Sequence, residues 1–409
     1  MYLNRLSLTN FRAFTRLDMD VPRRTLLLVG DNAQGKTTVL EAIYYLATFT
    51  SFHAQNDRQL INFVAGQEPL SVARIVADYQ TGGQGGSAGQ ARRLEVRLIQ
   101  EAGGMNGSVR LRKEILVDGV KRSVHEAMGA FTAVIFLPQM TRIIEGGPDE
   151  RRRYLNLALS QIVPGYSRAL SEYGQAVSQR NALLKQLYER GGDPEQLVYW
   201  DTLLADRGGL IVHARIEAVH ELEQIAARIH HRLTHSEEIL RLVYRPSYDP
   251  VPQPNGQFAL PMQAPVNRSV YSLERIRSGF MQKLAEVRRE EISRGVTTVG
   301  PHRDEMRLLS NGIDLGDYGS RGQVRTALLA LKLAEVTWIK KKTGEWPVLL
   351  LDEILAELDT QRRSDLQTFL LEYEQTMLTT TDLKLFDPAF VDQSTIWQVE
   401  QGMVKVPER

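Results

Sequence analysis

The sequence of 409 residues contains no cysteine. This absence excludes disulfides, thiolate metal ligands and a thiol nucleophile. No uninterrupted apolar run approaches the roughly 18 residues that a membrane-spanning helix needs, and the first residues lack the apolar core of a secretory signal. We therefore expect a cytoplasmic protein that has no membrane association.

The chain also lacks a strong excess of charge, because its formal net charge is +1. A charge this small excludes an overall basic field that would attract nucleic acid. Basic residues do gather locally, over positions 92–122 and at Arg151, Arg152 and Arg153. Such clusters are most often solvated surface, and DNA binding would need one face assembled by folding. Because no aromatic residue lies within 92–122, backbone contact with duplex DNA is favoured over base stacking.

What the chain does contain is a phosphate-binding pattern close to its N-terminus. The motif G-x-x-x-x-G-K-T is formed by Gly30, Asp31, Asn32, Ala33, Gln34, Gly35, Lys36 and Thr37. It follows the apolar run 26–29 and precedes a predicted helix, which is the context of a P-loop. Loop N–H groups and the helix dipole would face the phosphates of ATP. Lys36 would add a positive charge, Thr37 would ligate Mg²⁺, and Thr38 would belong to the same site. A glycine turn that only caps a helix is the alternative.

A second pattern lies far downstream, where the apolar run 347–351 ends in Asp352 and Glu353. A strand this apolar is expected to be buried on both faces of a parallel sheet, with its C-terminal end beside the P-loop. Asp352 would then belong to the Mg²⁺ shell, and Glu353 would act as the general base for the attacking water. Taken alone, an apolar run before two acids is more often an ordinary strand end.

The third pattern is a helix start that carries Ser320, Gly322 and Gln323. Ser320 is a plausible helix N-cap, but the cluster also resembles the signature motif of ABC-type ATPases. In those proteins the signature motif of one subunit contacts ATP held by the P-loop of the other. The stretch 356–359 resembles the D-loop of the same proteins and ends at Asp359. Gln139, after the apolar run 134–137, occupies the place of their glutamine that senses Mg²⁺ and water.

The long separation of these motifs, together with further matches, identifies the chain as similar to the RecF family. Transporter ATPases place the P-loop and the acidic strand much closer together. The further matches are the opening segment Leu6–Arg12, Gly147-Pro148 followed by residues 151–155, and Gly300-Pro301-His302-Arg303-Asp304. They run across nearly the whole chain. RecF proteins are bacterial DNA replication and repair ATPases of the SMC-like ABC group.

The resemblance implies an ATP-dependent homodimer that grips duplex or gapped DNA and helps to load recombinase, with RecR and RecO as partner proteins. It implies a weak DNA-dependent ATPase and adds Arg12 to the nucleotide site. The family differs from most ABC ATPases where these have a switch histidine; here Thr381 is the best candidate for that role. The alternatives are the ATPase subunit of a membrane transporter and the ATPase head of a nuclease complex.

The expected fold class is α/β, an ABC-type P-loop ATPase head of mixed sheets and helices with an inserted, mainly helical lobe. We expect the head to comprise 1–150 and 296–409 and the lobe to comprise 151–295. The lobe should contain a helix over 166–190 and a longer one whose apolar stripe ends at Leu233. A proline-rich connector over 250–265 should lead to a further helix over 273–292.

Overall fold

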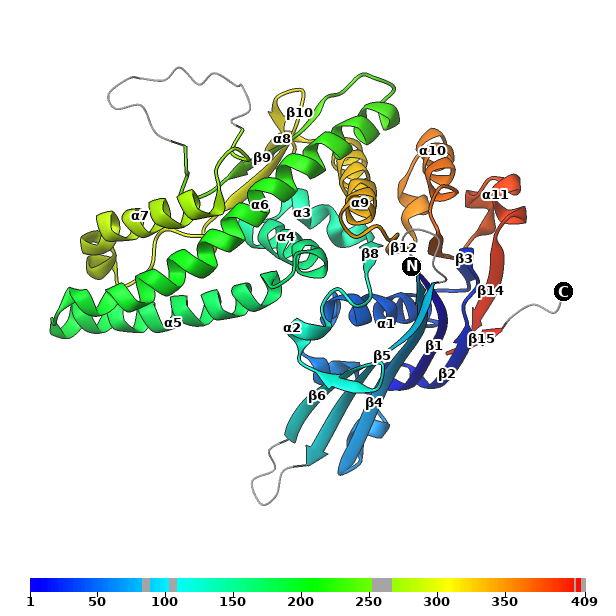
Figure 1. Ribbon diagram of the computed structural model, residues 1–409. Coiled ribbons are helices and arrows are strands. Elements are labelled where there is room, and N and C mark those ends of the chain that lie inside the picture. Colours follow the sequence, from blue (N-terminus) through cyan, green and yellow to red (C-terminus); the bar gives the residue numbers. More distant parts are fainter. Residues whose placement is uncertain (83–88, 103–108, 252–266, 401, 406–409) are drawn as a thin grey trace. The chain divides into compact units, whose positions relative to one another are not determined.

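The computed structural model describes residues 1–82, 89–102, 109–251, 267–400 and 402–405 (Figure 1). The chain forms two compact units, the first made of residues 1–140 and 332–409 and the second of residues 141–331. Most of the expected proline-rich connector lies outside the described residues. None of the helices among the described residues is long and apolar enough to cross a membrane.

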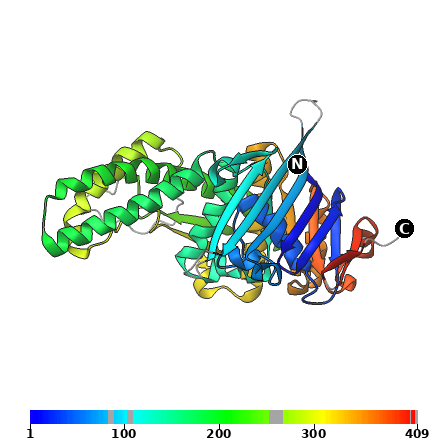
Figure 2. The same ribbon diagram turned by 90° about the horizontal axis from the view of Figure 1, so that it is seen from below.

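The first unit contains a six-stranded antiparallel sheet in the order β2-β1-β4-β5-β6-β7. Its strands run side by side in Figure 2, coloured blue to cyan. Strands β4 and β5 form a long antiparallel ribbon, in which twelve residue pairs from Leu70↔Glu101 to Thr81↔Gln90 are in register. The strands are β1 (Tyr2–Phe11), β2 (Phe14–Asp20), β4 (Leu70–Thr81), β5 (Gln90–Ala102), β6 (Val109–Val117) and β7 (Val120–Arg122).

The second sheet of this unit has the order β15-β14-β3-β13-β12-β8 and is parallel except for β15. All five residues of β12 are buried, as its unbroken apolar sequence predicts for a strand inside a parallel sheet. The carboxyl ends of parallel strands meet at one edge, which is where ligands bind in open α/β sheets. The strands are β3 (Arg24–Val29), β8 (Ala133–Phe136), β12 (Val348–Asp352), β13 (Gln375–Thr380), β14 (Thr395–Glu400) and β15 (Met403–Lys405).

The helix α1 (Lys36–Thr48) contacts strands of both sheets. It touches β4 and β5 of the antiparallel sheet and β8, β12 and β13 of the parallel one. A single apolar core therefore contains side chains from α1 and from both sheets. The shorter helices of this unit are α2 (Val124–Ala127), α10 (Thr360–Leu370) and α11 (Pro388–Asp392).

The second unit is mainly helical and is built on the neighbouring helices α5, α6 and α7 (Figure 1). The helix expected over 166–190 is confirmed as α5, and the apolar stripe ending at Leu233 belongs to a helix of 37 residues, α6. A small antiparallel sheet, β11-β10-β9, completes the unit. The elements are α3 (Arg142–Glu145), α4 (Pro148–Ile162), α5 (Tyr166–Arg190), α6 (Leu197–Leu233), β9 (Leu240–Arg245), α7 (Leu273–Arg294), β10 (Glu305–Ser310), β11 (Ile313–Asp314), α8 (Leu315–Tyr318) and the first half of α9 (Arg321–Thr343).

The boundaries of the second unit differ from the expected lobe of 151–295, because this unit runs from 141 to 331. Two long-range pairings explain the difference. The strand β10, assigned from sequence to the C-terminal head segment, is hydrogen-bonded to β9. The helix α4, which begins at Pro148, packs against β10, α5 and α6.

Candidate nucleotide site

The loop after β3 turns sharply beneath the end of the parallel sheet. The N–H of Gly30 donates to the carbonyl oxygen of Thr380, 3.3 Å away. A β-carbon at Gly30 would lie 2.2 Å from the carbonyl oxygen of Val399, so only glycine fits. Gly35 has φ of 110° immediately before α1, a backbone conformation that favours glycine. The two glycines of the motif therefore allow a tight turn that leads directly into a helix N-terminus.

Lys36 is held beneath this loop, with only 4% of its surface exposed. Its ammonium donates to the carbonyl oxygens of Gly30 (2.7 Å) and Asp31 (2.9 Å). The same nitrogen lies 3.1 Å from a carboxylate oxygen of Glu353. A fixed cation thus lies at the start of a helix, where backbone N–H groups already favour an anion.

Thr37 and Asp352 meet although most of the chain separates them. The Thr37 hydroxyl lies 2.9 and 3.0 Å from the two carboxylate oxygens of Asp352. Their meeting follows from the sheet order β3-β13-β12, which brings the carboxyl end of the acidic strand to the P-loop edge. A hydroxyl and a carboxylate are oxygen ligands that suit Mg²⁺, so the residues present fit this ion.

The sequence reasoning missed Thr379, which lies at the centre of this group. Its hydroxyl donates to Asp352 Oδ1 at 2.6 Å and accepts from the backbone N–H of Glu353 at 3.0 Å. The sequence singled out Thr381 instead, which is exposed and follows the end of β13. The register of β13 on β12, which pairs Asp352 with Thr379, is the feature that distinguishes the two threonines.

A pocket of about 630 Å³ opens beside the P-loop, a volume typical of sites that hold a ligand of nucleotide size. Thr37, Thr38 and Asp352 line it together with Arg12. The Arg12 guanidinium donates to both carboxylate oxygens of the buried Glu41, at 2.9 and 2.7 Å. The structure therefore brings Arg12 and Thr38 into the same pocket as the predicted metal ligands.

Gln139 and Asp359 follow strand ends in the same unit. Gln139 is in the turn Pro138–Thr141 after β8, the strand that pairs with β12. Asp359 is the N-cap of α10 and accepts from the backbone N–H of Arg362 at 2.9 Å. That hydrogen bond holds the pKa of the Asp359 carboxyl below its ordinary value.

The predicted signature residues lie at the start of α9, in the second unit. Ser320 caps the helix, because its hydroxyl accepts from the Gln323 N–H at 3.2 Å and its own N–H donates to the Gln323 side chain at 3.1 Å. Gly322 is exposed beside it. The Gln323 amide also donates to Glu238 at 3.0 Å, and Glu238 accepts from Ser310 at 2.7 Å. These bonds tie the exposed helix start to β10.

Comparison with known proteins decides the family. The family model described as "RecF/RecN/SMC N terminal domain" matches residues 2–405. The chain is 37% identical over 416 residues to the DNA replication and repair protein RecF of Herpetosiphon aurantiacus, covering 99% of each. It is 37% identical over 414 residues to the RecF of Roseiflexus castenholzii, covering 98% of this chain and 99% of that one. The chain belongs to the RecF family of DNA replication and repair proteins.

Solved structures agree with this assignment. The recombination mediator protein RecF of the RecFOR pathway, solved as RecF-ATP, superposes with a TM-score of 0.80 at 29% identity, covering 100% of this chain and 98% of that one. The structure solved as RecF-ATPrS superposes with a TM-score of 0.79, covering 99% of this chain and 97% of that one. An SMC head bound to the C-winged helix domain of ScpA superposes with a TM-score of 0.51 at 14% identity, which is a likeness of fold alone. The expected fold class, an ABC-type ATPase head, is confirmed.

The three arginines of the basic run in this RecF-family chain differ in exposure, because Arg151 is buried, Arg152 is half-buried and Arg153 is exposed. Arg151 is 3% exposed and donates to both carboxylate oxygens of Glu305, at 2.6 and 2.7 Å. Arg152 pairs with Asp149 and donates to the carbonyl oxygen of Asp304. Arg151 is therefore held by a half-buried acid of β10 that is distant in sequence, and it does not belong to an exposed basic face.

The motif 300–304 also has contacts within the second unit. Asp304 is buried and accepts from Arg215 at 3.0 Å and from the hydroxyl of Tyr244. The Tyr173 hydroxyl lies 2.7 Å from His302 Nδ1. Burial lowers the pKa of His302 to about 4, so the imidazole is neutral at physiological pH. Of the three charged or titratable residues in this motif, His302 and Asp304 therefore have partners inside the second unit.

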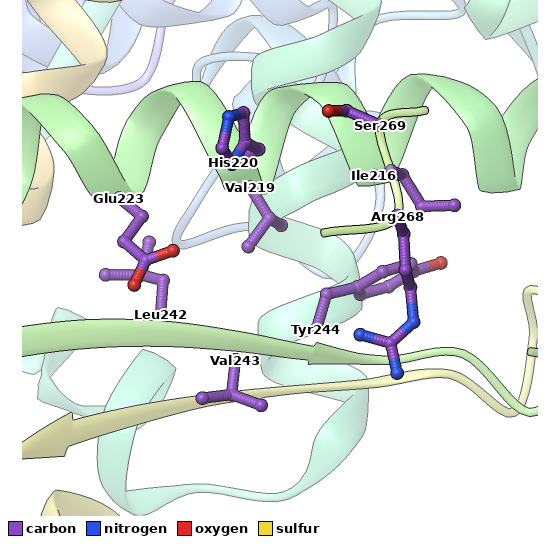
Figure 3. A pocket seen from close by; sticks show the side chains of 9 residues that line it. All are labelled: Ile216, Val219, His220, Glu223, Leu242, Val243, Tyr244, Arg268 and Ser269. Atoms are coloured by element: carbon purple, nitrogen blue, oxygen red, sulfur yellow. The ribbon is translucent and has the colours of Figure 1, made fainter. Parts of the chain in front are cut away.

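A second pocket lies between α6 and β9 (Figure 3). His220 and Glu223 of α6 and Tyr244 of β9 line it together with Arg268. Its volume is about 60 Å³, which accommodates a few water molecules but not a nucleotide.

Proposed function

We propose that this protein binds and slowly hydrolyses ATP with Mg²⁺, and that ATP controls its grip on DNA. The contact of Thr37 with Asp352, beside the Lys36–Glu353 pair, carries the proposal. It joins the two sequence motifs that phosphoryl-transfer sites of this class require. The likeness to RecF-ATP over the full chain supports the same ligand.

Each residue has a distinct task in this proposal. Lys36 presents its charge to the β- and γ-phosphates, and the loop N–H groups bind phosphate oxygens. Thr37 and Asp352 would hold Mg²⁺, with Gln139 beside them; the bound ion neutralises phosphate charge. Glu353 takes the proton of the attacking water. Because Lys36 lies 3.1 Å from Glu353, a triphosphate that engages Lys36 weakens this ion pair and makes the carboxylate available as a base.

Two subunits would share each ATP across a two-fold axis. Ser320, Gly322 and Gln323 of one subunit would contact the γ-phosphate bound at the P-loop of the other. Asp359 would cross the same interface. Thr381 would take the place of the switch histidine, and the lack of an imidazole there is consistent with slow turnover.

The ATP-bound dimer would grip duplex DNA at gaps or at junctions of single and double strands. It would then help to load recombinase in the cytoplasm, with RecR and RecO as partners. Two likenesses support this part: the relatives from Herpetosiphon aurantiacus and Roseiflexus castenholzii are DNA replication and repair proteins, and the solved RecF is a recombination mediator of the RecFOR pathway. Hydrolysis would end the grip by separating the subunits.

Binding of a fluorescent ATP analogue and a DNA mobility shift with and without ATP test this function. Lys36→Met should abolish nucleotide binding and the ATP-dependent part of the shift. Lys185→Met removes a lysine whose side chain is 72% exposed and should change neither. Wild-type protein that binds ATP but shows no ATP-dependent DNA binding would overturn the DNA role and favour a transporter-type ATPase. Unchanged nucleotide affinity in Lys36→Met would overturn the site itself.

A further inference from the structure

Three threonines of β13 are almost completely buried, and their hydroxyls have different surroundings. Thr376, Thr379 and Thr380 are 1%, 3% and 3% exposed. The hydroxyl of Thr376 has no hydrogen-bond partner among the described residues. The hydroxyl of Thr380 donates to the carbonyl oxygen of Asp382 and accepts from its N–H. Only Thr379 contacts the acidic pair.

We propose that Thr379 is a positioning residue that holds both acids of the site. A hydroxyl has one proton, and Thr379 donates it to Asp352 Oδ1 over 2.6 Å. Its oxygen then accepts the backbone N–H of Glu353 over 3.0 Å. One buried atom thereby restrains the carboxylate assigned to the metal and the backbone of the residue assigned as base.

The backbone of Glu353 makes this restraint necessary. Its φ is 51°, a left-handed conformation that a non-glycine residue adopts only when its surroundings hold it there. Its N–H is directed at Thr379, whose carbonyl oxygen lies 3.3 Å away in addition to the hydroxyl. If that N–H lost the hydroxyl, the turn that directs the Glu353 side chain toward Lys36 would be held less firmly.

The orientation of Asp352 depends on the same atom. Thr37 contacts both of its oxygens, at 2.9 and 3.0 Å, and Thr379 contacts Oδ1 alone. Without Thr379 the carboxylate could rotate about its bond to Cβ. Removing a hydrogen bond that orients a metal ligand typically weakens metal affinity by about 10–100-fold. This inference rests on the proposed function, because it assigns Thr379 a task in the proposed ATP–Mg²⁺ site.

The test compares Thr379→Val, which removes the hydroxyl, with Thr379→Ser, which keeps it. Thr376→Val and Thr380→Val are matched controls on the same strand, with side chains on the opposite face from Thr379. The main measurement is the Mn²⁺ dissociation constant of the protein with a non-hydrolysable ATP analogue, from the electron paramagnetic resonance signal of free Mn²⁺. Analogue binding in EDTA, kcat, KM and thermal unfolding are measured in parallel.

We expect Thr379→Val to weaken Mn²⁺ binding by about tenfold or more and to lower kcat, with analogue binding in EDTA unchanged. Thr379→Ser and both control variants should stay within about twofold of wild type, which separates positioning from general stability of the strand. If Thr379→Val does not fold, Thr379→Ala against Thr379→Ser makes the same comparison.

Two results would overturn the inference while leaving the proposed function intact. One is wild-type Mn²⁺ affinity in Thr379→Val, and the other is an equal loss in Thr379→Ser or in either control. A wild-type protein that binds neither the analogue nor Mn²⁺ would overturn the proposed function, and the inference with it.

Discussion

Replacing Arg151 with alanine should destabilise the protein strongly without touching the nucleotide site. The guanidinium makes two hydrogen bonds to Glu305 and two more to the carbonyl oxygens of Ile144 (3.1 Å) and Gly146 (2.7 Å). Truncation leaves a carboxylate with 16% of its surface exposed, whose remaining cation is Arg307, 3.4 Å from Glu305 Oε2. Breaking a buried ion pair from one side costs about 3–5 kcal/mol. We expect the lower end, about 3 kcal/mol, because some water reaches Glu305.

Urea unfolding followed by circular dichroism measures this loss, with Arg153→Ala as the control. Arg153 is exposed on the same helix, and its truncation should change the free energy of unfolding by less than about 0.5 kcal/mol. Glu305→Gln added to Arg151→Ala should recover part of the loss, because the carboxylate that has lost its two hydrogen bonds from Arg151 is then removed.

The pH dependence of the difference follows from the same pair. The net effect of burial and of the Arg151 hydrogen bond is to lower the pKa of Glu305 below 4.5. The stabilisation is therefore present above the unfolded pKa and is lost as the pH falls through the lower folded pKa. If Arg151→Ala were as stable as wild type but bound DNA less well, the structural role assigned to Arg151 would be wrong.

Four further predictions concern the site and the second unit. Glu353→Gln should bind ATP at least as tightly as wild type but hydrolyse it about 10²–10⁴-fold more slowly, measured by phosphate release. Ser320→Arg should bind ATP but fail to dimerise by light scattering, and mixing it with Lys36→Met should restore some ATPase activity, because one site of the mixed dimer is intact. Glu238→Ala should weaken ATP-dependent dimerisation without changing ATP affinity, because it releases the side chain that anchors the signature helix. As the pH falls from 6.5 to 4, the free energy of unfolding should decrease by at most about 1.4 kcal/mol per pH unit, because His302 takes up its proton at a higher pH in the unfolded chain than in the folded one. His302→Gln should flatten this slope in urea titrations.

Each of these has a result that would refute it. Wild-type turnover in Glu353→Gln would remove that residue as the base. ATP-driven dimers of Ser320→Arg, or mixed dimers without activity, would refute a site shared between subunits. Glu237→Ala is the control for Glu238→Ala, and an equal loss in both would show that local charge matters rather than the bond to Gln323. If the free energy of unfolding of His302→Gln has the same pH slope as wild type, groups other than His302 cause the pH dependence.

Local patterns in the sequence determined several elements of this protein. The glycines at 30 and 35, the apolar run before them and Lys36 specify a P-loop, because backbone conformation and phosphate chemistry act over a few neighbouring residues. The helix Tyr166–Arg190 and the cap at Ser320 were predicted for the same reason. The family also followed from short motifs spread along the chain.

Only the tertiary structure decided which distant residues meet. The register of β13 on β12 places Thr379, and not Thr381, against Asp352, and a shift of one residue would turn a different side chain toward the acids. The pairing of β10 with β9 moves the boundary of the second unit, and β10 also brings Glu305 to Arg151. In each case the partner is set by packing between segments far apart in the chain, and neither periodicity nor residue type carries that information.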